Sequence, residues 1–133
     1  MSIAVGIDLQ PFDEVEESLR LFGERYTRRL YTNAELRDVS GDPHLAAQEF
    51  AMLFAAKEAV MKVLTPSSEI PSWLDIEVRQ VKDCSPSISL SGVAAQLAHR
   101  QGITDIVVRL GVVEQSATAA ASAVKHIEVS GSR

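Results

Sequence analysis

Two carboxylates stand where the surrounding sequence is apolar. Asp8 follows the run IAVGI at 3–7, and Glu58 lies inside the segment FAAKEAVMKVL at 54–64. Burying an unpaired charge costs on the order of several kcal/mol, so each side chain needs a partner or a ligand. A carboxylate at a strand end and one on a buried helix, converging on one point, would form a hard-oxygen site for Mg²⁺. Proteins hold that ion with one or two carboxylates plus substrate phosphates and waters.

Two lysines flank Glu58. Lys57 precedes it directly and Lys62 follows four residues later. Beside a metal that binds a phosphate substrate, both would be phosphate-facing cations. Two structural alternatives use the same residues. Glu58 and Lys62 have the spacing and order that favour an ion pair along one helix, and Lys57 can extend its ammonium group out of an apolar belt. Spacing alone does not decide among these interpretations.

The element that must position Asp8 is a strand at 3–9. Its nearly continuous apolar character predicts a central place in a sheet. Pro11 ends the strand and can open a helix, and the helix predicted at 13–22 carries one apolar stripe on a charged surface. The segment 24–31 that follows is dense in basic and aromatic residues.

The element that must position Glu58 is a long helix predicted at 44–64, which Pro43 can open. This segment has almost no polar face, so the helix must be surrounded by protein. A shorter helix is predicted just before it, at 33–39. There Thr32 and Glu35 have the spacing of a capping box, in which each side chain accepts a hydrogen bond from the other residue's backbone.

The rest of the chain predicts mainly strands. Alternation at 73–78 and a short run at 88–90 indicate a hairpin. One further helix and two further strands are predicted at 92–100, 103–108 and 117–129. Strands bracket helices without a regular βαβ rhythm, so the fold class is α+β, with a mainly antiparallel sheet packed on the long buried helix. A chain of 133 residues without repeats or linkers predicts a single domain over 1–133.

Composition argues against several classes of protein. The 46% of hydrophobic and 23% of charged residues are typical of a globular domain, and no apolar run approaches the roughly 20 residues of a membrane-spanning helix. A net charge of −5 argues against nucleic-acid binding, which needs a basic face. The N-terminus lacks the pattern of a secretory signal, and the only cysteine, Cys84, cannot form an internal disulfide. We therefore expect a cytoplasmic protein.

Two short motifs carry a resemblance to a known family. Gly6-Ile7-Asp8 and the segment FAAKEA at 54–59 resemble the two signature blocks of the holo-[acyl-carrier-protein] synthases, which are small 4′-phosphopantetheinyl transferases. Weaker blocks follow in the family's order. They lie at 29–36, 75–78, 88–92 and 102–103.

The resemblance implies an activity and an assembly. The family transfers the 4′-phosphopantetheine arm of coenzyme A to a serine of an apo acyl carrier protein, releases 3′,5′-ADP and requires Mg²⁺. Such carriers serve fatty-acid or polyketide synthesis, and the sequence does not say which is used here. The resemblance also implies a homotrimer with active sites between neighbouring subunits.

The resemblance further implies roles for individual residues. Asp8 and Glu58 would ligate the metal, which in the family binds the coenzyme pyrophosphate, while Lys57 and Lys62 would neutralise phosphates. Deprotonation of the attacking serine would fall to a metal-bound water or to Glu58 itself. Glu35 is a candidate to hold that water, although a role as helix cap explains it equally well.

Three segments depart from the family pattern and affect the expected coenzyme and carrier contacts. A late Ser-x-Ser/Thr-His pattern is replaced by RLGV at 109–112, a glycine-containing turn by TPSS at 65–68, and a Gly-Lys-Pro hairpin by CSP at 84–86. An alternative function is therefore a degenerate, non-catalytic homologue that binds a carrier protein or coenzyme A as a scaffold or regulatory subunit.

Carrier recognition should use a basic face, because carrier proteins are acidic. Asp13 and Glu14 place negative charge where relatives often have a basic residue. The remaining basic and aromatic cluster, which we call the arginine cluster, comprises Arg25, Tyr26, Arg28 and Arg29. It is predicted to dock the carrier; the alternative is a solvated surface with no partner.

Overall fold

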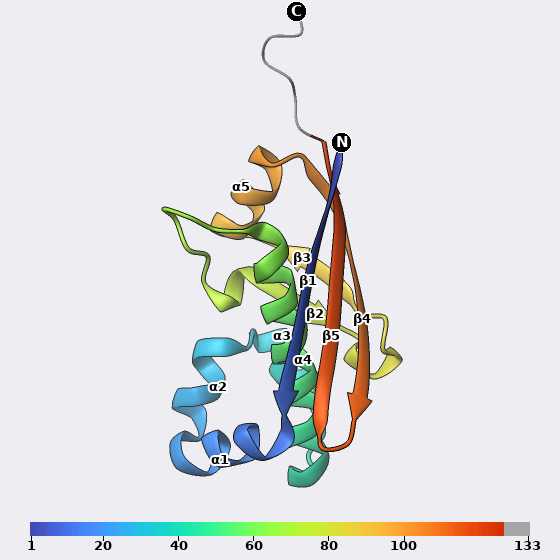
Figure 1. The fold of residues 1–133 in the computed structure, drawn as a ribbon. Coiled ribbons are helices and arrows are strands. Elements are labelled where there is room, and N and C mark those ends of the chain that lie inside the picture. The colour runs from blue at the N-terminus through green and yellow to red at the C-terminus, as the bar shows by residue number, and fades with distance from the viewer. Residues whose placement is uncertain (127–133) are drawn as a thin grey trace, which may run out of the picture.

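The main layer of the fold is a three-stranded antiparallel sheet in the order β1–β5–β4 (Figure 1). The computed structural model describes residues 1–126. The strands are β1 (Ser2–Pro11), β4 (Ile103–Val113) and β5 (Ser116–Lys125). The prediction that the first strand is central was wrong, because β5 takes the centre and β1 lies at one edge.

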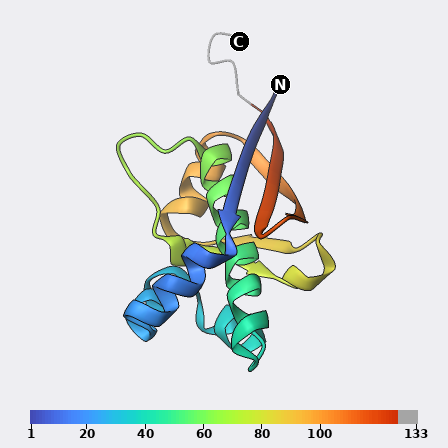
Figure 2. The same cartoon turned by 60° about the horizontal axis from the view of Figure 1, so that its bottom comes forward.

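The long helix α4 (Pro43–Leu64) crosses the inner face of this sheet, and Figure 2 shows it running behind β1. Its first turn is capped by Asp42, whose side chain accepts a hydrogen bond from the backbone N–H of His44. Small side chains line the contact from both sides, so helix and sheet approach closely. They are Ala55, Ala56 and Ala59 on α4 and Ala117, Ala119, Ala121 and Ala123 on β5.

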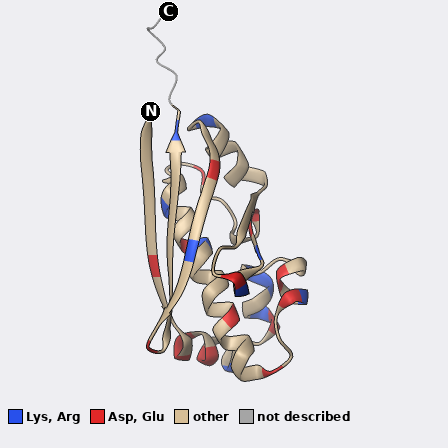
Figure 3. Cartoon of the chain, turned by 90° about the vertical axis from the view of Figure 1, so that its right-hand side faces the viewer, with Lys and Arg blue, Asp and Glu red and all other residues tan. Residues whose placement is uncertain are grey.

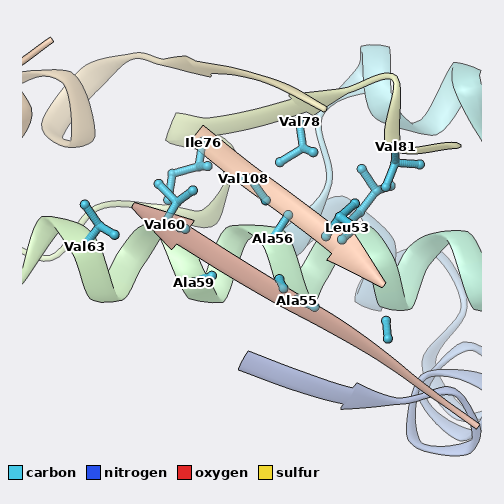
Figure 4. Close-up of a cluster of buried hydrophobic side chains, with 14 of the residues drawn as sticks. Leu53, Ala55, Ala56, Ala59, Val60, Val63, Ile76, Val78, Val81 and Val108 are labelled. Atoms are coloured by element: carbon cyan, nitrogen blue, oxygen red, sulfur yellow. The ribbon is translucent and has the colours of Figure 1, made fainter. Parts of the chain in front are cut away.

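A second core layer lies on another side of α4 (Figure 4). There Leu53, Val60 and Val63 are buried with residues of a two-stranded antiparallel sheet, β2 (Ile76–Arg79) and β3 (Ser87–Leu90). The hairpin prediction is confirmed, with one difference. The segment expected to be strand from residue 73 begins with a 3₁₀ turn, η1 (Trp73–Asp75), and a second, η2 (Val81–Asp83), follows β2.

The remaining helices occupy the two ends of the molecule. Helices α1 (Phe12–Phe22), α2 (Glu24–Leu30) and α3 (Asn33–Asp38) gather at the end where β1 finishes, and α5 (Gly92–Arg100) covers the other (Figure 1). The predicted α+β class is therefore confirmed. Strand β4 continues five residues beyond the predicted end, and the predicted end of the last strand, residue 129, lies outside the described residues. No helix in the described range is long and apolar enough to cross a membrane.

The outer face of the three-stranded sheet is largely apolar, and the described residues leave it uncovered. The helices of the described residues lie on the other side of the sheet, and the three strands carry four charged residues, Asp8, Asp105, Arg109 and Lys125 (Figure 3). Strand β1 contributes four large side chains, each more than half exposed: Ile3, Val5, Ile7 and Leu9. The large apolar residues of this strand thus lie on its exposed face, and not on two covered faces as predicted. Ala4, Gly6 and Asp8 fill the inner positions.

Candidate active site

Asp8 reaches α4 because strand β1 passes unusually close to that helix at Gly6. A Cβ atom on Gly6 would lie 2.1 Å from the carbonyl oxygen of Ala59 and 2.9 Å from Cβ of Lys62. Only glycine fits such an approach. Two residues later on the same face of the strand, the Asp8 side chain is therefore held against the last turns of α4.

Lys62 is the first helical partner of Asp8. Its Nζ donates a hydrogen bond of 2.6 Å to the carbonyl oxygen of Ile7 and lies 3.4 Å from Oδ1 of Asp8. The Lys62 side chain is half exposed, so one side of its ammonium group faces solvent. The structure brings these two predicted site residues together. The alternative pairing of Lys62 with Glu58 is not among the ion pairs of the described residues.

Glu58 lies one helical turn before Lys62 and is half-buried. Burial raises the pKa of its carboxyl group above the ordinary value, and the negative charge of Asp8 raises it further, against a smaller opposing effect of Lys62. Asp8 and Glu58 are thus near enough to repel each other. A pair of mutually repelling, partly desolvated carboxylates is a site that a cation would stabilise.

One atom of this pair fits a cation ligand directly. Oδ2 of Asp8 is buried and has no hydrogen-bond partner within the described residues. Buried carboxylate oxygens are normally paired, so an oxygen without a partner needs an explanation such as an ion. No group of three or more His, Cys, Asp or Glu side chains in residues 1–126 is arranged to hold a metal. Two carboxylates with further ligands from a substrate match the coordination typical of Mg²⁺.

Lys57 does not join this site. Its side chain is fully buried, and its Nζ lies 2.9 Å from Oε1 of Glu35, 2.9 Å from the carbonyl oxygen of Trp73 and 2.6 Å from that of Ile76. These three partners use all three ammonium protons. Burial lowers the pKa of Lys57, while the charge of Glu35 opposes that effect. The placement is contrary to the predicted phosphate contact and to an ammonium group extended into solvent, because adjacent helical residues point about 100° apart.

Glu35 is likewise enclosed. Its Oε1 accepts a hydrogen bond of 2.8 Å from the backbone N–H of Thr32, and its Oε2 accepts one of 2.7 Å from that of Val78. The capping box predicted for Thr32 and Glu35 is present. Since both carboxylate oxygens are occupied and the side chain is fully buried, this geometry does not match the predicted role of holding a catalytic water.

The arginine cluster lies on α2, beside a hollow of about 680 Å³ between α1 and α2. Arg25 and Arg29 line the hollow together with Phe22, and the guanidinium of Arg25 lies 6.0 Å from the centre of the Phe22 ring. Arg28 points elsewhere and pairs with Glu24 at 3.5 Å.

Tyr26, the aromatic member of the arginine cluster, is half-buried. Its hydroxyl shares a hydrogen bond of 3.1 Å with that of Tyr31, and burial raises the pKa of Tyr26. Two of the four predicted docking residues therefore combine positive charge with an apolar hollow.

Comparison with known proteins identifies the family. The family model described as "4′-phosphopantetheinyl transferase superfamily" matches residues 4–120. The chain belongs to this superfamily. Holo-[acyl-carrier-protein] synthases from Paramagnetospirillum magneticum and Desulforudis audaxviator are similar to it, at 40% identity over 83% of each chain and at 35% over 93% of this chain and 94% of the relative.

Solved structures share the fold. A coenzyme A complex of the synthase named for Chronobacterium ammoniagenes superposes with a TM-score of 0.81 at 21% identity, covering 96% of this chain and all of that one. The acyl carrier protein synthase of Mycobacterium tuberculosis gives a TM-score of 0.69 at 29% identity, covering 94% of this chain and 100% of that one. At 21% identity the first likeness supports the fold alone.

Sequence reasoning missed two features of this transferase site. Gly6 sets the distance between β1 and α4, and the backbone carbonyl of Ile7 anchors Lys62. A glycine inside an apolar β-branched strand was the available signal for the first, because glycine weakens a strand unless another backbone approaches closely. The second had no signal, because any backbone carbonyl can accept a hydrogen bond.

Proposed function

We propose that this chain is a holo-[acyl-carrier-protein] synthase, which moves the 4′-phosphopantetheine group of coenzyme A to a serine of an apo carrier and releases 3′,5′-ADP. Family membership and the relatives' names support the reaction. The observation that carries the assignment to a site is the buried, unpartnered oxygen of Asp8 beside the carboxyl group of Glu58.

The proposed roles follow from the positions of three side chains. Asp8 and Glu58 hold Mg²⁺, which when bound supplies positive charge that neutralises the pyrophosphate and the transition state. Lys62 keeps its contact with the Ile7 carbonyl and turns its solvent-facing side to a phosphate oxygen. Glu58 or a water held at the site would accept the proton of the attacking serine; a carboxylate that also ligates a metal would be the weaker base.

Carrier recognition is assigned to the arginine cluster. Arg25 and Arg29 line a hollow that also contains Phe22, so this surface offers positive charge beside an apolar contact. An acidic carrier with an amphipathic helix fits both features. The acidic first turn of α1, with Asp13 and Glu14, repels the same partner and moves the docking position towards α2.

Self-association is assigned to the outer face of the three-stranded sheet. Four large apolar side chains of β1 are exposed together, continued on the neighbouring strands by Val107 and Val124. An apolar patch of this kind marks an interaction site. We assign it to further copies of this chain in a homotrimer, with each active site completed by a neighbour. A cytoplasmic location completes the proposal, in keeping with a single, exposed cysteine.

One incubation tests the function. Purified protein, coenzyme A, Mg²⁺ and apo carriers of fatty-acid and polyketide type are combined, and intact carrier mass is followed by mass spectrometry. We expect the mass of one phosphopantetheine group to be added, the reaction to stop with a chelator, and Asp8→Asn to be inactive. A protein that binds the carrier or coenzyme A but never changes the carrier mass would be the non-catalytic homologue instead.

A further inference from the structure

The buried ion pair of Lys57 and Glu35 contacts one particular strand edge. Within the described residues, the two-stranded sheet β2–β3 leaves the other side of β2 without a strand neighbour. On that side the carbonyl oxygen of Ile76 accepts a hydrogen bond from Lys57, and the N–H of Val78 donates one to Glu35. Backbone groups of residues two apart in a strand point to the same edge. A neighbouring strand would offer this alternation of donor and acceptor.

The same pair reaches two further segments. Lys57 also donates to the carbonyl oxygen of Trp73 in η1, and Glu35 also accepts from the N–H of Thr32 at the start of α3. Two side chains thus satisfy four backbone groups from three segments of the chain. An ion pair is an expensive way to fill a core, since apolar residues of similar volume are often as stable or more stable. The advantage of this ion pair over apolar side chains is that its hydrogen bonds fix the direction in which each backbone segment lies.

We propose that Lys57 and Glu35 are positioning residues that together take the place of a missing strand along β2 and lock β2–β3 and α3 onto the helix that carries Glu58. The inference rests on the proposed function, because three parts of the proposed site meet at this pair. Helix α4 carries the metal-binding carboxylate, α3 follows the arginine cluster, and the β2–β3 connection replaces the family hairpin at 84–86.

The informative variant removes both charges at once. Lys57→Met/Glu35→Met keeps the side-chain volume and leaves no buried unpaired charge, so it separates folding from positioning. We expect it to fold, and we expect amide exchange at Val78 to accelerate at least tenfold. Exchange at Glu77 should not change, because that residue faces β3 by alternation. The internal comparison of neighbouring amides excludes a general loss of stability.

The rate of phosphopantetheine transfer should fall in the double variant, because β2–β3 and α3 are no longer held in place on α4. Misplacement by about 1 Å costs on the order of 10²-fold in rate, so we expect kcat to fall by about that factor with saturating coenzyme A and carrier. Val108→Ala, a buried substitution on β4, which carries neither member of the pair, serves as the control for destabilisation. It should keep kcat within about threefold of wild type at an equal or larger loss of Tm.

Each other outcome overturns the inference. Fast exchange at Val78 with unchanged kcat would make the pair structural only, and lost kcat with a protected Val78 would assign the effect to something other than the β2 edge. If the double variant does not fold, Glu35→Gln, which keeps an acceptor for Val78, should preserve both readouts better than Glu35→Ala; equal losses would refute the edge contact. If the wild-type protein showed no transfer at all, the proposed function would be refuted. Amide exchange at Val78 would then still test whether the pair contacts the edge of β2.

Discussion

Replacing Gly6 with alanine tests the geometry on which the site depends. The new Cβ would lie 2.1 Å from the carbonyl oxygen of Ala59, whereas ordinary contact begins at 3.4 Å, so strand and helix must separate by about 1.3 Å. Both groups belong to backbone, so no flexible side chain can move away instead. Overpacking of this kind costs about 1–3 kcal/mol of unfolding free energy.

The separation acts directly on the site. Asp8 moves with β1 while Glu58 and Lys62 move with α4, so the contact between Lys62 and the Ile7 carbonyl lengthens and the two carboxylates part. A displacement of about 1 Å costs on the order of 10²-fold in rate when it misaligns reacting groups. We therefore expect Gly6→Ala to fold with a lower Tm and to lose roughly two orders of magnitude in kcat/KM for transfer.

The assay compares Gly6→Ala with Gly41→Ala, where a Cβ would meet nothing within 4 Å. Both variants are followed by thermal unfolding and by mass spectrometry of the carrier under saturating Mg²⁺. Gly41→Ala should match wild type in both. A Gly6→Ala variant with wild-type kcat/KM would show that the distance between β1 and α4 does not set the rate and that Gly6 does not align the site.

Three further sets of substitutions test charge and assembly. Glu58→Gln should abolish transfer yet raise the Tm at neutral pH. Because the folded pKa of Glu58 is raised, the wild-type side chain contributes its full stability only below its unfolded pKa, and that contribution is lost as pH rises through the folded pKa. The Tm advantage of the variant should therefore vanish near pH 4. Arg25→Glu and Arg29→Glu should each raise the KM for carrier several-fold at low salt without changing the KM for coenzyme A, whereas Arg28→Glu, whose wild-type side chain pairs with Glu24, should change it less. Val5→Lys should give a monomer by light scattering at micromolar concentration with an unchanged fold, since that side chain is exposed in the single chain; an unchanged mass would place the assembly surface elsewhere.

Local patterns predicted the elements well. The capping box at Thr32 and Glu35, the proline-opened helix α4 and the β2–β3 hairpin each depend on residues a few positions apart, and each is present. The place of β1 was not predicted, because a run of apolar residues looks the same when both faces are covered by one chain and when one face is left exposed.

The charged residues form two separate ion pairs, Lys57 with Glu35 and Lys62 with Asp8, and sequence spacing could not predict either pair. Lys57 and Glu35 are 22 positions apart and meet only through the packing of α3 and β2 on α4. Asp8 and Lys62 are 54 apart and meet only because Gly6 admits the helix. Only Lys62 has a charged competitor at helical spacing, Glu58 four residues earlier, and the tertiary contact with Asp8 takes its place.

Adjacent residues on α4 have opposite surroundings, and this explains why the segment combines an apolar character with two neighbouring charges. A rotation of about 100° from one residue to the next turns Lys57 towards β2 and Glu58 towards β1. The first direction is dry and needs a charge that is matched completely by protein groups, as it is. The second opens at Asp8, where one buried carboxylate oxygen has no hydrogen-bond partner among residues 1–126. The segments that depart from the family pattern, at 65–68, 84–86 and 109–112, include neither Asp8 and Glu58 nor Lys57 and Glu35. Changes there can therefore alter contacts to coenzyme A and carrier while leaving the carboxylate pair and the buried ion pair intact.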